Sequence, residues 1–152
     1  MTARDDMTGK TKILVIEDEP GVSMMMVYLL TQAGCEVQTA WSAERGMRLA
    51  QTSAFDLITL DVSLPGVNGF EICGLLNENP FFSTPIVFVS GQFCEENMRR
   101  AFELGAVDFI EKPFEMTDFV FRIISHAKAN SCPSDVLDEN TNANAQSLCN
   151  AS

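Results

Sequence analysis

Short apolar runs alternate along the chain with longer segments in which apolar residues recur at helical spacing. The first run, residues 13–16, is continuously apolar, which predicts a strand that is covered on both faces. In the next segment, 22–33, apolar residues fall on one predicted helix face: Val22, Met25, Met26, Leu29, Leu30 and Ala33. Pro20 suits the first turn of this helix and Gly34 suits its end.

The same alternation continues to about residue 129. Further strands are predicted at 36–40, 57–60, 86–89 and 107–110. Further helices are predicted from Ser42 to about 50, over 70–77, in a segment that ends near Gly105, and over 116–127. Five such βα units predict an α/β fold, in which a parallel sheet with right-handed crossovers carries helices on both faces.

Two polar ends flank the periodic body, which we place at residues 12–129. The segment 130–152 contains no Lys, Arg or aromatic residue and is rich in Asn, Ser and Ala. It cannot bury enough apolar area to offset the entropy lost on ordering, so we predict a flexible tail or the remnant of a linker. Residues 1–11 are predicted to be a short flexible lead-in.

Composition and charge narrow the class of protein. Apolar residues make up 46% of the chain, which excludes wholesale disorder, and 10 Lys+Arg against 21 Asp+Glu give a net charge of −11. A chain this acidic is unsuited to coat nucleic acid or an anionic membrane, and it lacks an apolar run of the ~18–20 residues that a membrane span needs. The start of the chain has no apolar signal-peptide core, and the five cysteines are scattered without a CxxC pair. We therefore expect a cytoplasmic protein with free thiols.

Charged and hydroxyl side chains collect where the predicted strands end. Glu17 and Asp18 follow the first strand, Asp61 the third, Ser90 ends the fourth and Lys112 follows the fifth. The carboxyl ends of parallel strands share one edge, and that edge is where such sheets bind ligands. Converging carboxylates repel one another unless a cation lies among them, and oxygen ligands suit Mg²⁺. A nearby hydroxyl and ammonium suit phosphoryl oxygens, so the pattern predicts a magnesium site where an aspartate meets phosphate.

Four segments carry a family resemblance: 13–20 (ILVIEDEP), 61–69 (DVSLPGVNG), 89–91 (VSG) and 112–114 (KPF). Together they resemble the receiver domain of bacterial two-component response regulators, over nearly the whole of 12–129. The resemblance implies a doubly wound, flavodoxin-like (βα)5 fold, similar to that of chemotaxis regulators, with five parallel strands in the order 2-1-3-4-5.

The resemblance also implies the roles of the acidic residues. Asp61 is the phosphoacceptor, the nucleophile that forms an aspartyl phosphate. Asp18 binds Mg²⁺ directly, Glu17 holds it through water, and Asp61 and the backbone carbonyl of Ser63 complete the protein ligands. The acidic pair begins with Glu17 where many receivers have aspartate, a departure that leaves metal binding intact.

Further roles follow for residues around the acidic cluster. Lys112 pairs with Asp61 and then with the phosphoryl group, and Ser90 is the switch hydroxyl that moves to bond a phosphoryl oxygen. Phe109 matches an aromatic position that turns inward on activation, although a plain core phenylalanine is the alternative. The positions of Ser63 and Gln92 tune the lifetime of the phosphate.

The implied function is a signalling switch that catalyses only its own phosphorylation and dephosphorylation. The donor is a histidine kinase or a histidine phosphotransfer protein, and phosphorylation changes the surface of the fourth helix, fifth strand and fifth helix. That surface controls an output partner or supports a homodimer. Phe121 falls off the apolar stripe of the last helix, so it is a candidate contact for a partner.

Two other functions remain open. A phosphatase that works through an aspartyl phosphate would carry a second aspartate at position 63, where this chain has Ser63, so its general acid is missing. A receiver that binds its partner without phosphorylation is disfavoured by the intact set of site residues. The chain could act alone or be the receiver part of a longer regulator or hybrid kinase.

Overall fold

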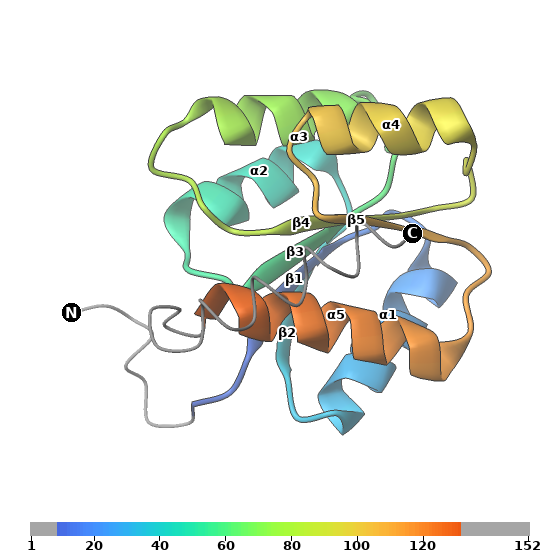
Figure 1. Cartoon of the computed structure of the whole chain (residues 1–152). Coiled ribbons are helices and arrows are strands. Elements are labelled where there is room, and N and C mark those ends of the chain that lie inside the picture. Colours follow the sequence, from blue (N-terminus) through green and yellow to red (C-terminus); the bar gives the residue numbers. More distant parts are fainter. Residues whose placement is uncertain (1–8, 132–152) are drawn as a thin grey trace, which may run out of the picture.

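The computed structural model describes residues 9–131, which form five strands and five helices in strict alternation (Figure 1). The strands are β1 (Lys12–Ile16), β2 (Glu36–Ala40), β3 (Leu57–Leu60), β4 (Ile86–Ser90) and β5 (Asp108–Glu111). The helices are α1 (Pro20–Gln32), α2 (Ala43–Thr52), α3 (Gly69–Glu78), α4 (Glu95–Glu103) and α5 (Met116–Ser131). Every predicted element is present, and the boundaries differ from the predicted ones by only a few residues.

The five strands form one parallel sheet in the order β2-β1-β3-β4-β5. This confirms the predicted doubly wound α/β fold. The order reverses beside β1, whose two neighbours are β2 and β3, so the ends of β1 and β3 border a topological switch point. In the register of the sheet Ile16 lies opposite Leu60, and Ser90 lies opposite Glu111. The residues that follow these strands are thereby brought to one edge.

The sheet is covered on both faces, which explains why its central strands are mostly apolar and almost fully buried. Helices α1 and α5 cover one face, and α2, α3 and α4 cover the other (Figure 1). On the first face, Met26 and Leu30 of α1 pack with Phe119 and Ile123 of α5 in one buried cluster. The larger second cluster includes Phe88 of β4 together with buried residues of the three other helices.

The buried face of α1 differs from the predicted one. Its buried residues are Ser23, Met26 and Leu30, whereas Met25 and Ala33, both predicted inward, are exposed. The small side chain of Ser23 is buried in place of Met25, which lies near the carboxyl edge of the sheet instead. Hydrophobicity alone did not show this, because the helix is apolar on nearly all sides.

Local signals at the helix ends agree with the sequence. Ser42 accepts a hydrogen bond from the backbone N–H of Arg45 at 3.2 Å and so caps α2 as predicted. Gly34 follows α1 with a φ of 95°, a left-handed conformation that favours glycine.

The predicted flexible ends, 1–11 and 130–152, lie largely outside the described residues. Within the described part, β1 begins at Lys12 and α5 continues through Ser131, two residues beyond the predicted body. No helix within residues 9–131 has the length and apolar character to cross a bilayer. Of the cysteines in this range, Cys35, Cys73 and Cys94 are free thiols, as expected.

Candidate functional site

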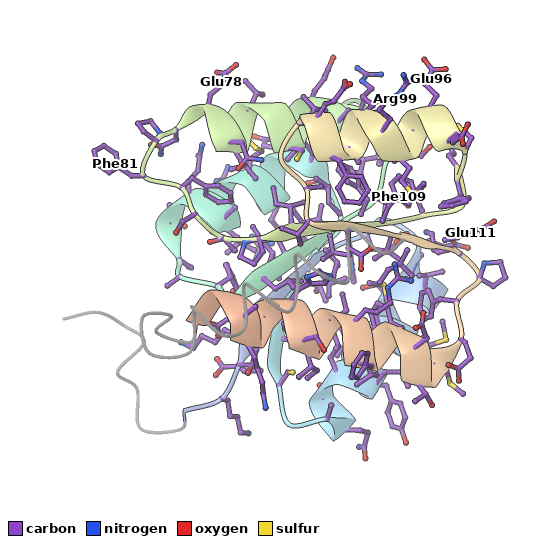
Figure 2. The ribbon with its side chains drawn as sticks, in the orientation of Figure 1. Glu78, Phe81, Glu96, Arg99, Phe109 and Glu111 are labelled. Atoms are coloured by element: carbon purple, nitrogen blue, oxygen red, sulfur yellow. The ribbon has the colours of Figure 1, made fainter. Side chains whose placement is uncertain are left out.

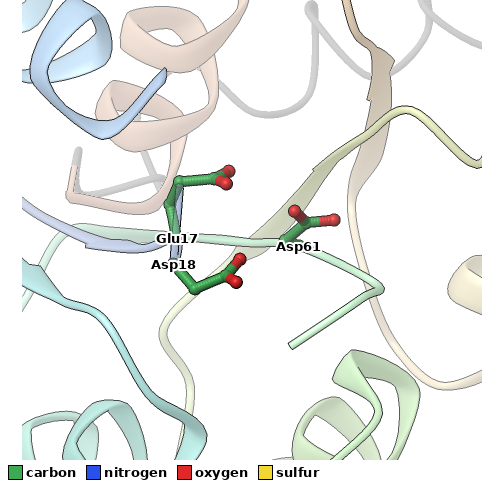
Figure 3. Close-up of side chains that lie close together, drawn as sticks. All are labelled: Glu17, Asp18 and Asp61. Atoms are coloured by element: carbon green, nitrogen blue, oxygen red, sulfur yellow. The ribbon is translucent and has the colours of Figure 1, made fainter. Parts of the chain in front are cut away.

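Three carboxylates meet at the carboxyl edge of the sheet. Glu17 and Asp18 follow β1 and Asp61 follows β3, and one carboxylate oxygen from each lies within 4.8 Å of the others (Figure 3). Glu17 and Asp61 are buried, with 1% and 6% of their surface exposed, whereas Asp18 is open to solvent. The convergence predicted from the strand ends is therefore present, with an open side at Asp18.

Lys112 reaches this cluster from the loop that follows β5. Its Nζ lies 3.1 Å from a carboxylate oxygen of Glu17 and 3.1 Å from one of Asp61. Its backbone N–H donates to the carbonyl of Ser90 at 2.9 Å, and the Lys112–Pro113 peptide bond is cis. Burial by itself would lower the pKa of Lys112, but the hydrogen bond and charge of Asp61, and then those of Glu17, raise it. The ammonium is thus charged at neutral pH and joins the two buried carboxylates.

The cluster keeps an excess of negative charge. Burial raises the pKa of Glu17, the hydrogen bond from Lys112 opposes that rise, and the charge of Asp61 adds to it. The cluster has three carboxylates but only one ammonium, which pairs with Glu17 and Asp61, so a divalent cation would relieve the remaining repulsion. This is the one cluster of three potential metal ligands within residues 9–131. Its all-oxygen donor set and its open side suit Mg²⁺, which keeps several waters when bound.

The loop after β3 fixes the Asp61 carboxylate. The backbone N–H of Ser63 donates to Oδ1 of Asp61 at 3.2 Å. The N–H of Gly69 donates to the carbonyl of Val62 at 2.8 Å, which draws the start of α3 onto the residue after Asp61. Asn68 caps that helix, because its side-chain oxygen accepts a hydrogen bond from the backbone N–H of Phe70 at 2.7 Å. The acidic group therefore stands on a loop that is held at both ends.

Ser90 and Gln92 form the side of the site opposite the acidic pair. Ser90 ends β4, is almost fully buried, and its Oγ accepts from the N–H of Gln92 at 3.1 Å. The side-chain amide of Gln92 donates to Oγ of Ser63. These residues line a cavity of about 590 Å³ that also contains Asp61 and Lys112. Met25 and Phe114 give it an apolar wall, which the sequence did not indicate.

Phe109 lies on the face of the sheet that α3 and α4 cover (Figure 2). Only 3% of its surface is exposed. Its ring stacks on Phe88 with centroids 5.8 Å apart, and Phe93 of the β4–α4 loop meets it edge-on at 5.6 Å. The ring is thus part of the core and also contacts the loop that follows Ser90. Its role as a moving switch stays a prediction.

Sequence reasoning missed a charged cluster at the start of β5, the opposite end of that strand from Lys112. Asp108 at the start of β5 accepts from Nε and Nη2 of Arg122 at 3.0 and 2.6 Å, and Nε2 of His126 lies 3.0 Å from the same carboxylate. Burial would raise the pKa of Asp108, but the hydrogen bonds from Arg122 and His126 lower it. The available signal was the i,i+4 spacing of Arg122 and His126, which places both on one face of α5.

A family model and curated relatives of this chain all belong to the response regulators. The model of the response regulator receiver domain matches residues 13–124. The chain is 31% identical over 118 residues to the transcriptional regulatory protein ResD of Bacillus subtilis, covering 78% of this chain and 48% of ResD. It is 33% identical over 113 residues to the response regulator ArlR of Staphylococcus aureus, covering 74% of this chain and 51% of ArlR. The chain spans about half the length of these relatives.

Solved structures agree with the sequence relatives. The non-phosphorylated HemR receiver domain of Leptospira biflexa superposes with a TM-score of 0.72 at 32% identity, covering 78% of this chain and 94% of that one. The receiver domain of the sensor histidine kinase PA1611 of Pseudomonas aeruginosa, solved with magnesium in its active-site cleft, has a TM-score of 0.71, covering 78% of this chain and 98% of its own. At 19% identity that second likeness supports the fold alone. Fold, site geometry and family match together show that the chain belongs to the response regulator receiver domain family.

Proposed function

We propose that this receiver domain takes a phosphoryl group onto Asp61 from a histidine kinase or a histidine phosphotransfer protein. The observation that carries the proposal is the buried Asp61 carboxylate, which lies 3.1 Å from the Lys112 ammonium and beside two further carboxylates at one edge of the sheet. A buried carboxylate with one oxygen held by Lys112 and the other by a backbone N–H is oriented for attack.

The chemistry is a transfer between two nucleophiles. An oxygen of Asp61 bonds to phosphorus while the bond from phosphorus to the donor imidazole nitrogen breaks, and the imidazole keeps the electron pair. Lys112 then pairs with an oxygen of the transferred group. Dephosphorylation is a separate reaction: water attacks phosphorus, the bond to Asp61 breaks, and the Asp61 carboxylate and inorganic phosphate are released.

Magnesium fits the residues present. Glu17, Asp18, Asp61 and the backbone carbonyl of Ser63 would hold it, and when bound it would neutralise the charge of phosphate approaching a carboxylate. The other residues then have distinct tasks. Ser90 donates its hydroxyl to a phosphoryl oxygen, Lys112 balances the added charge, and the Asp61 loop keeps its place through its backbone contacts.

The output follows from movement of the Ser90 loop. Because Phe93 of that loop touches Phe109, a shift of Ser90 toward the phosphoryl group repacks Phe109 and changes the surface formed by α4, β5 and α5. That surface binds the output partner or a second receiver, with exposed Phe121 on α5 as a further contact. Ser63 and Gln92 set the lifetime of the phosphate from the rim of the site.

The test is intact mass after incubation with acetyl phosphate, with and without Mg²⁺. We expect the wild type to gain one phosphoryl group only with Mg²⁺, and Asp61→Asn to gain none. Asp118→Asn is the matched control, because it removes an exposed carboxylate on α5 away from the cluster. Phosphoramidate, which carries a phosphorus–nitrogen bond, is the second donor.

The outcomes separate the candidate functions. Uptake of a phosphoryl group by the wild type and Asp118→Asn, but not by Asp61→Asn, supports Asp61 as the phosphoacceptor. A folded, Mg²⁺-binding protein that gains no phosphoryl group from either donor or from a kinase favours a receiver that binds its partner without phosphorylation. Rapid turnover of many phosphate esters without accumulation would instead indicate a phosphatase.

A further inference from the structure

Asn97 in the first turn of α4 holds the loop that carries the switch hydroxyl. Its side-chain amide donates to the backbone carbonyl of Gln92 at 2.7 Å. The ordinary task of a polar residue in a first turn is to help begin the helix, but here Cys94 is the N-cap, and its Sγ accepts from the backbone N–H of Asn97 at 3.4 Å. The side chain of Asn97 is therefore used for the loop and not for the cap.

Gln92, which Asn97 holds, is the residue that links the two loops of the site. Its N–H donates to Oγ of Ser90, at the buried end of β4. Its side-chain amide donates to Oγ of Ser63, and the N–H of Ser63 donates in turn to the Asp61 carboxylate. A continuous path of hydrogen bonds thus runs from α4 to Asp61.

The contact between Gln92 and Ser63 lies at the rim of the cavity. Both residues are exposed, whereas Asp61 and Ser90 beneath them are 6% and 1% exposed. The side chain of Gln92 therefore spans the opening between the loop after β3 and the loop after β4. This opening is a route by which water reaches the phosphorus of an aspartyl phosphate on Asp61.

We propose that Asn97 is a positioning residue that prolongs the phosphorylated state by fixing Gln92 across the rim of the site. This inference rests on the proposed function of Asp61. In the step that it slows, the oxygen of water bonds to phosphorus, the bond from phosphorus to Asp61 breaks, Asp61 recovers its carboxylate, and the protons of water leave with phosphate and solvent. Asn97 touches none of these atoms, and its effect passes through the carbonyl of Gln92.

The test compares the phosphate lifetime of the full chain and its variants. Each protein is phosphorylated with acetyl phosphate and Mg²⁺, the donor is removed, and loss of the phosphoryl group is followed by intact mass. We expect Asn97→Ala and Gln92→Ala each to shorten the half-life about three- to tenfold, the size of effect that one neutral hydrogen bond supports. We expect the double variant to be no shorter-lived than the shorter-lived single variant, because the two residues act as one unit.

Two controls separate positioning from stability. Asn97→Asp keeps the size of the side chain but loses the N–H that donates to the carbonyl of Gln92, so we expect it to shorten the half-life of the phosphate. This variant keeps the test valid if Asn97→Ala folds poorly. Arg99→Ala removes an exposed side chain of the same helix and should leave the half-life unchanged. If Asn97 only stabilised α4, its substitution would lower the melting temperature without changing the half-life of the phosphate.

The results have distinct consequences. Equal half-lives of wild type and both Asn97 variants, or an effect in the double variant equal to the product of the single effects, would overturn the role of Asn97 and leave the phosphoacceptor intact. A wild type that takes up no phosphoryl group would overturn both proposals. Shortened and non-additive half-lives would establish the path from α4 to the site.

Discussion

Gly69 at the start of α3 presses against the backbone of Asp61. A Cβ at position 69 would lie 2.0 Å from the carbonyl oxygen of Asp61 and 3.0 Å from Cα of Val62. Glycine is needed here for close approach and not for an unusual φ, because Gly69 is not among the glycines with positive φ. The contact is between two backbones, so no side-chain rotation could relieve it.

Gly69→Ala should therefore displace the Asp61 loop. We expect a loss of about 1–3 kcal/mol in the free energy of unfolding, the range for overpacked sites. We also expect the folded variant to take up less phosphate, because its Asp61 carboxylate moves away from Lys112. Urea unfolding and intact mass after acetyl phosphate measure the two effects.

Gly21→Ala is the matched control for this substitution. It adds the same methyl group to a helical glycine with open space beside it, because the new carbon would meet nothing within 4 Å. Its stability should therefore be unchanged or slightly higher. Equal stability and uptake in Gly69→Ala and Gly21→Ala would show that the Asp61 loop tolerates the shift.

The fold was predictable because local signals and sheet burial agree. Each central strand is mostly apolar and almost fully buried, and each helix has a periodic face or a cap such as Ser42. The orientation of α1 was not predictable from periodicity. Its buried stripe contains Ser23 and its exposed side contains Met24 and Tyr28, so hydrophobicity alone did not indicate which side meets the sheet.

The part of the site that was predictable consists of functional side chains that follow the ends of strands. Parallel strands bring Glu17, Asp18 and Asp61 to one edge whatever the loops do, and the receiver resemblance supplied their roles. Contacts made by helix packing were not predictable. Asp108 meets Arg122 because α5 packs against β5 at a particular angle, and the carbonyl of Gln92 meets Asn97 because the loop before α4 takes a particular conformation; no short motif records either.

Magnesium should stabilise the folded protein through the acidic cluster. A ligand that binds only the folded state at 100 times its Kd adds about 2.7 kcal/mol, so the melting temperature of the wild type should rise with Mg²⁺. Asp18→Asn removes the exposed carboxylate of the cluster and should lose most of this rise. Glu111→Gln, an exposed change on β5, should keep it. An equal rise in Asp18→Asn would show that Mg²⁺ binds elsewhere.

Arg122 should stabilise the protein in a pH-dependent way through Asp108. The pKa of Asp108 is lowered in the folded state, so its stabilising effect is fully present above the unfolded value of about 3.9 and is lost as the pH falls through the lower folded pKa. We expect Arg122→Gln to cost about 1–2 kcal/mol at pH 7, between the values for exposed and buried pairs. The difference from wild type should shrink below about pH 4.

Urea unfolding of both proteins between pH 3 and 7 measures this difference. Arg48→Gln is the control, because Arg48 is largely exposed and 3.7 Å from Glu44 on the same helix, where an ion pair contributes little. A cost for Arg122→Gln that stays constant across this pH range would mean that packing of the arginine side chain, and not its charge, stabilises β5 against α5.

Phe109 allows core packing to be separated from switching. Its ring contacts Phe88 of the core and Phe93 of the loop after β4, so a complete truncation to alanine would cost about 3–5 kcal/mol and obscure any signalling effect.

Phe109→Leu keeps most of the volume and removes the edge-on ring contact. We expect it to fold, to take up phosphate as the wild type does, and to show a smaller phosphorylation-induced change in amide exchange over α4. Phe55→Leu, a buried change in the same core cluster, should leave that change intact. If both variants respond like wild type, Phe109 is a core residue alone, and the Ser90 loop reaches α4 through Gln92 and Asn97 instead.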